Sequence, residues 1–162
     1  MAGIMKGMVY MKIEKTLIIS VLILLLSIST FAQDLNQLDW LNDLDGKSAA
    51  TYGDAVKIFA IQTSGRSSSF RADSSLLEKS GIALDGYSEG EELSRGMLAK
   101  MTARYLDLGG SLMYMVFGAE RYAFKACVAE GIMRGDASEN DIISGPELVE
   151  VLGRVSEIRG DR

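Results

Sequence analysis

The sequence predicts an all-helical (all-α) domain. Apolar side chains recur at the three- and four-residue spacing of a helix, and signals for β-strands are nearly absent. Three of the expected helices begin with a hydroxyl residue at the N-cap, at Thr51, Ser94 and Ser144. Two segments also share residues at a constant offset, which indicates a repeated unit. We therefore expect two clear helix–loop–helix repeats and one degenerate repeat, packed around one core in a small helical domain.

Residues 1–32 have the composition of an export signal. Lys12 and Lys15 form a basic start, residues 17–26 are apolar, and small residues at the end suit cleavage by a signal peptidase. Met11 alone would open a normal signal, so we expect translation to start there. The apolar run is shorter than the ~20 residues of a spanning helix. We therefore expect an exported protein, periplasmic or associated with the cell envelope, with no stable membrane insertion after cleavage.

The net charge of the chain limits the classes of binding partner that we expect. The whole chain has a net charge of −5, and cleavage removes three lysines and one glutamate, which makes the net charge −7. An acidic protein is poorly suited to nucleic acid or to anionic membrane surfaces. The expected partners are cell-wall polysaccharide or another envelope protein.

Residues 33–50 are expected to form a loosely ordered segment. A short helical turn there would place Trp40 as an apolar anchor, or as a ring that stacks on a carbohydrate. The helical repeat domain is expected over residues 51–158, followed by a tail at 159–162.

The first helix of the domain is expected over residues 51–62. Thr51 and Asp54 have the spacing of a capping box, and apolar residues follow on one face. A serine-rich loop separates this helix from a second one at 70–80, which Gly81 ends.

The third helix is expected to begin after Ser94 and to stop at Gly109-Gly110. Residues 111–117 are apolar without periodicity, so they form either a buried helical turn or a short strand. A fourth helix is expected at 119–130 and is closed by Gly131.

The repeat relates residues 81–104 to residues 131–154 at an offset of fifty, without a gap. The identical pairs are Gly81 and Gly131, Ile82 and Ile132, Ser88 and Ser138, Glu89 and Glu139, Ser94 and Ser144, Leu98 and Leu148, and Arg104 and Arg154. The second copy leads into a last helix with Pro146 in its first turn, and residues from Glu157 onward are expected to fray.

Both copies resemble the S-layer homology (SLH) module, a helix–loop–helix unit often found in threes. The resemblance lies in a Gly-Ile pair, a polar loop, a hydroxyl residue at the next helix start and an arginine further on. With residues 51–59 as a degenerate first copy, it covers most of the chain after the leader. It implies non-covalent attachment to cell-wall polysaccharide.

In that resemblance Arg95 occupies the position of the motif arginine, which contributes to recognition of glycan anions. Tyr52 and Gly145 stand at the same position in the other two copies. The binding candidates are Arg95, Ser94, Ser144 and Trp40.

Residues 136–147 offer an alternative function, because they have the spacing of an EF-hand-like calcium loop. The candidate ligands are Asp136, Ser138, Asn140, the backbone carbonyl of Ile142, Ser144 and Glu147. Asp141 stands where a sharp turn favours glycine, and Glu147 is also explained as a capping partner of Ser144.

Catalysis is the third possibility. The chain has no histidine, which excludes His-dependent triads and the commonest zinc sites. Its single cysteine, Cys127, forms no intramolecular disulfide and is expected to be a buried apolar residue rather than a reactive thiol. A carboxylate-dependent peptidoglycan hydrolase would use Glu120 as its acid, but no motif places a second acid. We therefore expect a non-catalytic binding or structural module, with no cofactor unless calcium binds.

Overall fold

Five labelled helices make up most of the structure, a computed structural model that describes residues 39–108 and 119–160. They are α2 (Tyr52–Ser64), α3 (Phe70–Lys79), α4 (Arg95–Tyr105), α6 (Glu120–Ala129) and α7 (Gly145–Gly160). Within the described ranges there is no β-strand, only two isolated bridges, Thr51 with Glu92 and Ser94 with Ile142. The prediction of an all-helical fold is therefore confirmed.

The chain divides into two compact units, Met1–Asp43 and Leu44–Arg162. In the first unit, the described residues 39–43 are helical and Trp40 is half-buried. The predicted export signal at 1–32, the glycine pair at 109–110 and the apolar segment 111–117 lie outside the described residues.

The larger unit begins before the predicted boundary at residue 51. Leu44 and Ala50 are fully buried, so they belong to its core rather than to a loose N-terminal segment. The segment predicted to be loose at 33–50 is also helical over residues 39–45.

Hydroxyl caps fix the helix starts as the sequence predicts. The Thr51 side chain accepts from the Asp54 N–H while the Asp54 carboxylate accepts from the Thr51 N–H, which completes a capping box. Ser94 caps α4 through the N–H of Met97. Ser144 and Glu147 form the same reciprocal pair at the start of α7.

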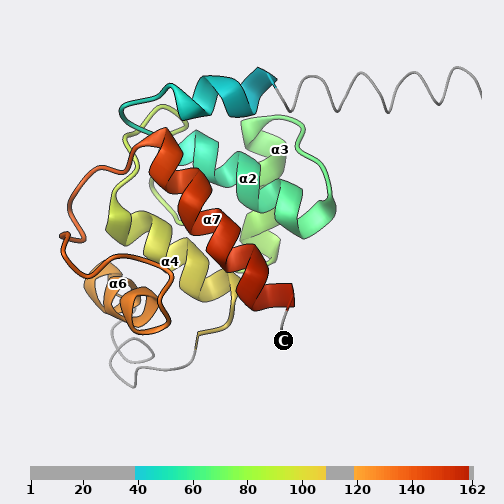
Figure 1. Ribbon diagram of the computed structural model, residues 1–162. Helices are drawn as coiled ribbons and strands as arrows, with labels where there is room; N and C mark the ends of the chain where they lie inside the picture. Colours follow the sequence, from blue (N-terminus) through green and yellow to red (C-terminus); the bar gives the residue numbers. More distant parts are fainter. Residues whose placement is uncertain (1–38, 109–118, 161–162) are drawn as a thin grey trace, which may run out of the picture. The chain divides into compact units, whose positions relative to one another are not determined.

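Helix α2 packs against α3, and α4 packs against α6. In Figure 1 the last helix, α7, crosses in front of α2 and α4. Side chains join it to both, since the Gln62 side chain donates to the Ser156 hydroxyl over 2.9 Å and Arg95 pairs with Glu147. The largest fully buried side chains come from all parts of this unit, among them Tyr52, Phe59, Leu77, Leu98, Met101, Ile132, Leu148 and Val155.

Three buried residues, Ala50, Leu93 and Ile143, form a closed ring of backbone hydrogen bonds just before α2, α4 and α7. The Ala50 N–H donates to Ile143 O over 2.8 Å, the Ile143 N–H to Leu93 O over 2.9 Å, and the Leu93 N–H to Ala50 O over 2.9 Å. All three residues are completely buried. This hydrogen-bonded ring brings the starts of the three helices together.

Several positions fifty residues apart have matching conformations. Helices α3 and α6 each have ten residues and begin and end at this offset, and α4 and α7 begin at it. Gly81 and Gly131, which follow α3 and α6, both have φ of 71°. These matches are consistent with the predicted repeat, whose origin by duplication stays a prediction.

Two helix ends differ from the predictions. Helix α4 ends at Tyr105 rather than at Gly109-Gly110, because Asp107 adopts a left-handed backbone with φ of 51°. Helix α7 continues to Gly160 although fraying was predicted from Glu157. The Arg159 guanidinium lies 4.1 Å from the centre of the Tyr105 ring, which holds the last turn against α4.

Candidate functional site

Arg95, the predicted motif arginine, is the first residue of α4 and is bound within the protein. Its guanidinium donates to Glu147 Oε1, while Glu147 Oε2 accepts from the N–H and hydroxyl of Ser144. Burial raises the pKa of Glu147, but the Ser144 N–H and the Arg95 guanidinium outweigh it and leave that pKa below its usual value. Arg95, Ser144 and Glu147 thus form one structural cluster that joins α4 to α7.

Two further arginines surround this cluster. Arg134 lies 3.7 Å from Glu150, and Arg154 pairs with Glu150 and donates to Ile132 O over 3.2 Å. The cleft lined by these side chains has a volume of only about 10 Å³, close to the space of a single water. The buried Arg95 Nε has no protein partner, so a water there would satisfy it, and the cleft has no room for a sugar.

Three of the predicted calcium ligands, Ser138, Ser144 and Glu147, have hydrogen-bond partners within the protein. The Ser138 N–H donates to Asp141 Oδ2 over 2.8 Å, and the Asn140 N–H donates to the Ser138 hydroxyl over 3.3 Å. Ile142 pairs with Ser94 in a bridge, and Asp136 is exposed. In the part of the chain that the structure describes, no group of three or more Cys, Asp or Glu side chains is placed to hold a metal ion.

Three further residues that the sequence singled out have partners or are buried within the larger unit. Ser94 is the cap of α4. Glu120 accepts a hydrogen bond from the Tyr87 hydroxyl over 2.9 Å. Cys127 is fully buried, and burial raises the pKa of its thiol to about 12, as the prediction of an unreactive cysteine requires.

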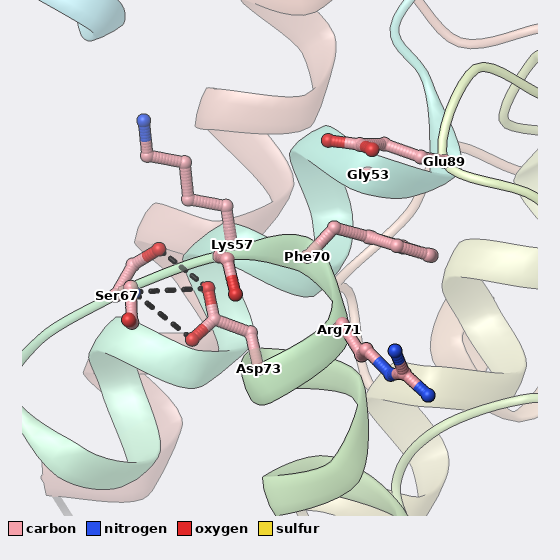
Figure 2. Close-up of a pocket in the computed structure, with 9 residues that line it drawn as sticks. Gly53, Lys57, Ser67, Phe70, Arg71, Asp73 and Glu89 are labelled. Atoms are coloured by element: carbon pink, nitrogen blue, oxygen red, sulfur yellow. Dashed lines mark hydrogen bonds between the residues drawn. The ribbon is translucent and has the colours of Figure 1, made fainter.

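A larger cavity lies where the sequence predicted only a loop and two helices. This α2–α3 pocket, shown in Figure 2, has a volume of about 470 Å³. Its lining residues are Gly53, Lys57, Ser67, Ser68, Ser69, Phe70, Arg71, Asp73 and Glu89. Lys57 comes from α2, the residues from Phe70 to Asp73 come from the first turn of α3, and Glu89 comes from the following loop.

Asp73 organises one wall of the α2–α3 pocket. Asp73 is 5 % exposed, and its carboxylate accepts from the Ser67 hydroxyl over 2.5 Å and from the Ser68 N–H over 3.1 Å. Burial lowers the pKa of Lys57, while the nearby Asp54 and Asp73 act in the opposite direction. The wall therefore combines a fixed acceptor with a partly desolvated cation.

Sequence reasoning missed this pocket, because its residues are ordinary for a loop and a helix start. Ser69 caps α3, and the serine run before it reads as a flexible connection. The one signal in the sequence was Asp73, an acid four residues after the cap Ser69. In the structure its carboxylate accepts a hydrogen bond from the preceding loop.

Comparisons with protein families, with curated proteins and with solved structures found no match for this chain. None of the described helices has the length and apolar character that a bilayer crossing requires.

Proposed function

We propose that this chain is an exported, non-catalytic binding module of the bacterial cell envelope, and that its α2–α3 pocket holds a segment of wall glycan. The observation that carries the proposal is the composition of this pocket. Cationic donors, carboxylate acceptors and serine hydroxyls surround a half-buried aromatic ring in a cavity of about 470 Å³.

A sugar suits this arrangement because each of its hydroxyls is both a donor and an acceptor. Lys57 and Arg71 offer donors only, whereas Asp73 and Glu89 offer acceptors only. The Phe70 ring adds an apolar surface of the kind on which a sugar face packs.

The two cations favour an extended ligand over a single anion. In Figure 2 the side chains of Lys57 and Arg71 point away from one another, so they do not converge on one group. Two carboxylates also line the pocket, which would repel a compact anion. A chain of sugars would reach both cations and would place its hydroxyls near Asp73 and Glu89.

Co-sedimentation with purified sacculi tests the proposal. Chain lacking residues 1–32 should be retained, and the double variant Lys57→Gln/Arg71→Gln should bind roughly tenfold more weakly, because charged hydrogen bonds to the glycan are lost. Circular dichroism of both proteins checks that the fold is kept.

The matched control is Lys100→Gln/Arg121→Gln. Lys100 lies as far after the α4 cap, Ser94, as Lys57 lies after the α2 cap, Thr51. Arg121 lies fifty residues after Arg71. Neither residue lines the α2–α3 pocket. Equal losses in the two double variants would show that charge alone drives retention, and no retention of the unmodified chain would refute glycan attachment.

A further inference from the structure

A second cavity, of about 180 Å³, is lined by three aromatic rings. We call it the aromatic cavity, and its rings are those of Tyr52, Phe70 and Tyr87. The Tyr52 ring centre lies 5.5 Å from that of Tyr87 and 6.1 Å from that of Phe70. The cavity shares the lining residue Phe70 with the α2–α3 pocket, so the two are neighbours.

The rings are held in place by hydrogen bonds. The Tyr52 hydroxyl donates to Leu84 O over 3.0 Å and accepts from the Leu84 N–H over 2.8 Å. The Tyr87 hydroxyl donates to Glu120 Oε1 over 2.9 Å. Tyr52 is 2 % exposed, so a ligand would meet mainly the half-buried rings of Phe70 and Tyr87. The hydrogen bond to Glu120 orders the Tyr87 ring before binding, which lowers the entropy cost of binding.

The polar groups of the cavity are acidic. Glu78 and Asp85 line it and are exposed, and no lysine or arginine is among its lining residues. The nearby Arg104 guanidinium donates to the carbonyl oxygen of Ala83, which is one of those residues. Ser74 also lines it.

We propose that the aromatic cavity binds an organic ammonium group. Aromatic rings attract a cation through the negative potential of their faces, and two carboxylates beside them add direct attraction. An ammonium group also brings N–H donors, from which both carboxylates can accept hydrogen bonds. Apart from Phe70, different side chains carry this site and the proposed glycan site, so either can fail alone.

The corresponding positions of the second copy show that these residues are not required by the fold. Fifty residues after Phe70, Glu78, Asp85 and Tyr87 stand Glu120, Val128, Gly135 and Ala137. The matched backbone therefore carries no aromatic ring at these four positions, and neither of the two carboxylates has an acidic counterpart, since Glu120 stands in the place of Phe70. The aromatic and acidic composition belongs to one copy, as expected of a ligand site.

The experiment is a titration of the chain lacking residues 1–32 with tetramethylammonium chloride, followed by backbone amide resonances in NMR. The amides of residues 84–87 should shift with saturation. tert-Butanol, a neutral molecule of similar shape, and sodium chloride, a cation without apolar surface, should leave them unchanged. Each of three results would overturn the proposal. Equal shifts with tert-butanol would indicate a merely apolar cavity, and equal shifts with sodium chloride would indicate charge screening. The absence of any shift with tetramethylammonium would show that the site does not bind it.

Variants locate the binding. Glu78→Gln/Asp85→Asn and, separately, Tyr87→Leu should each raise the dissociation constant roughly threefold or more. Glu130→Gln, an exposed carboxylate that does not line the cavity, is the control and should bind as the unmodified chain does. Unchanged affinity in both test variants would place the ammonium elsewhere and refute the proposal.

A second pair of probes asks whether the amine belongs to a sugar. Glucosamine at a pH at which its amine is charged should shift the same amides, whereas N-acetylglucosamine, its neutral counterpart, should not. Shifts of these amides by both sugars alike would overturn the ammonium proposal. Sacculus retention of Glu78→Gln/Asp85→Asn is measured in parallel and reports on the proposed glycan site alone.

Discussion

Replacing Gly145 by alanine should destabilise the domain, while the same change at Gly153, in the same helix, should stabilise it. A Cβ at position 145 would lie 1.6 Å from the carbonyl oxygen of Leu44. That is about 1.5 Å short of a tolerable contact, so the backbone must move. The Gly145 N–H donates to Lys47 O over 2.9 Å at the same place, and this buried hydrogen bond would be broken as well.

The magnitude follows from two costs. Overpacking of a well-packed site costs about 1–3 kcal/mol, and loss of a buried hydrogen bond costs about 1–3 kcal/mol. The expected loss is therefore about 2–6 kcal/mol, out of a typical total of about 5–15 kcal/mol. At Gly153 a Cβ would meet no atom within 4 Å, so alanine should gain about 0.5–1 kcal/mol by restricting the unfolded chain.

Urea unfolding followed by circular dichroism measures both variants. For Gly145→Ala the midpoint should fall by roughly 1–3 M, given a mid-range slope of about 2 kcal/mol/M. For Gly153→Ala it should rise slightly. A Gly145→Ala protein that unfolds at the same urea concentration as the unmodified chain would refute the close approach of α7 to Leu44. The same approach explains why no side chain stands at 145, where the SLH resemblance has an arginine.

Four further predictions concern charge and reactivity. Burial raises the pKa of Asp54, but hydrogen bonds from Lys47 and Thr51 lower it by more, so its folded pKa lies below the unfolded value of 3.8. The stability that this group contributes is complete above pH 3.8 and is lost as the pH falls through the folded pKa. Asp54→Asn should therefore flatten the acid unfolding curve over that pH range. Arg95→Ala should lower the urea midpoint, because Glu147 loses its partner, yet keep sacculus retention; lost retention in a folded variant would give Arg95 the role that the resemblance implies. Addition of calcium or EDTA should leave the melting temperature unchanged, and a rise with calcium would support the calcium alternative. Cys127, with a pKa of about 12, should react with a thiol reagent only in denaturant, and reaction in buffer would contradict its burial.

Helix starts could be predicted from the sequence because their determinants are local. Thr51 and Asp54 lie three residues apart, so the capping box is visible in the sequence and present in the structure. The same holds for Ser94, for Ser144 with Glu147, and for the glycines that follow α3 and α6. The all-helical fold follows from these signals together with apolar spacing.

Contacts between distant segments could not be predicted in this way. The early end of α4 depends on Asp107 adopting a left-handed backbone, and the last turn of α7 depends on a contact between Arg159 and Tyr105. Arg95 was predicted as a ligand-binding residue because the sequence does not show that Glu147 lies beside it. The α2–α3 pocket depends on Asp73 turning back onto the preceding serines, a contact that periodicity does not encode.

The hydrogen-bonded ring of Ala50, Leu93 and Ile143 makes folding of the larger unit cooperative. Each member donates to one neighbour and accepts from the other, so removing any one leaves a buried N–H and a buried carbonyl unsatisfied on the remaining two. A fragment that contains only one or two of the three helix starts therefore cannot satisfy all of these backbone N–H and carbonyl groups. The ring also joins residues far apart in sequence, which raises contact order and favours slow, all-or-none folding over stepwise addition of units. In this respect the unit differs from linear repeat arrays, in which each repeat contacts only its neighbours and partial folding is common.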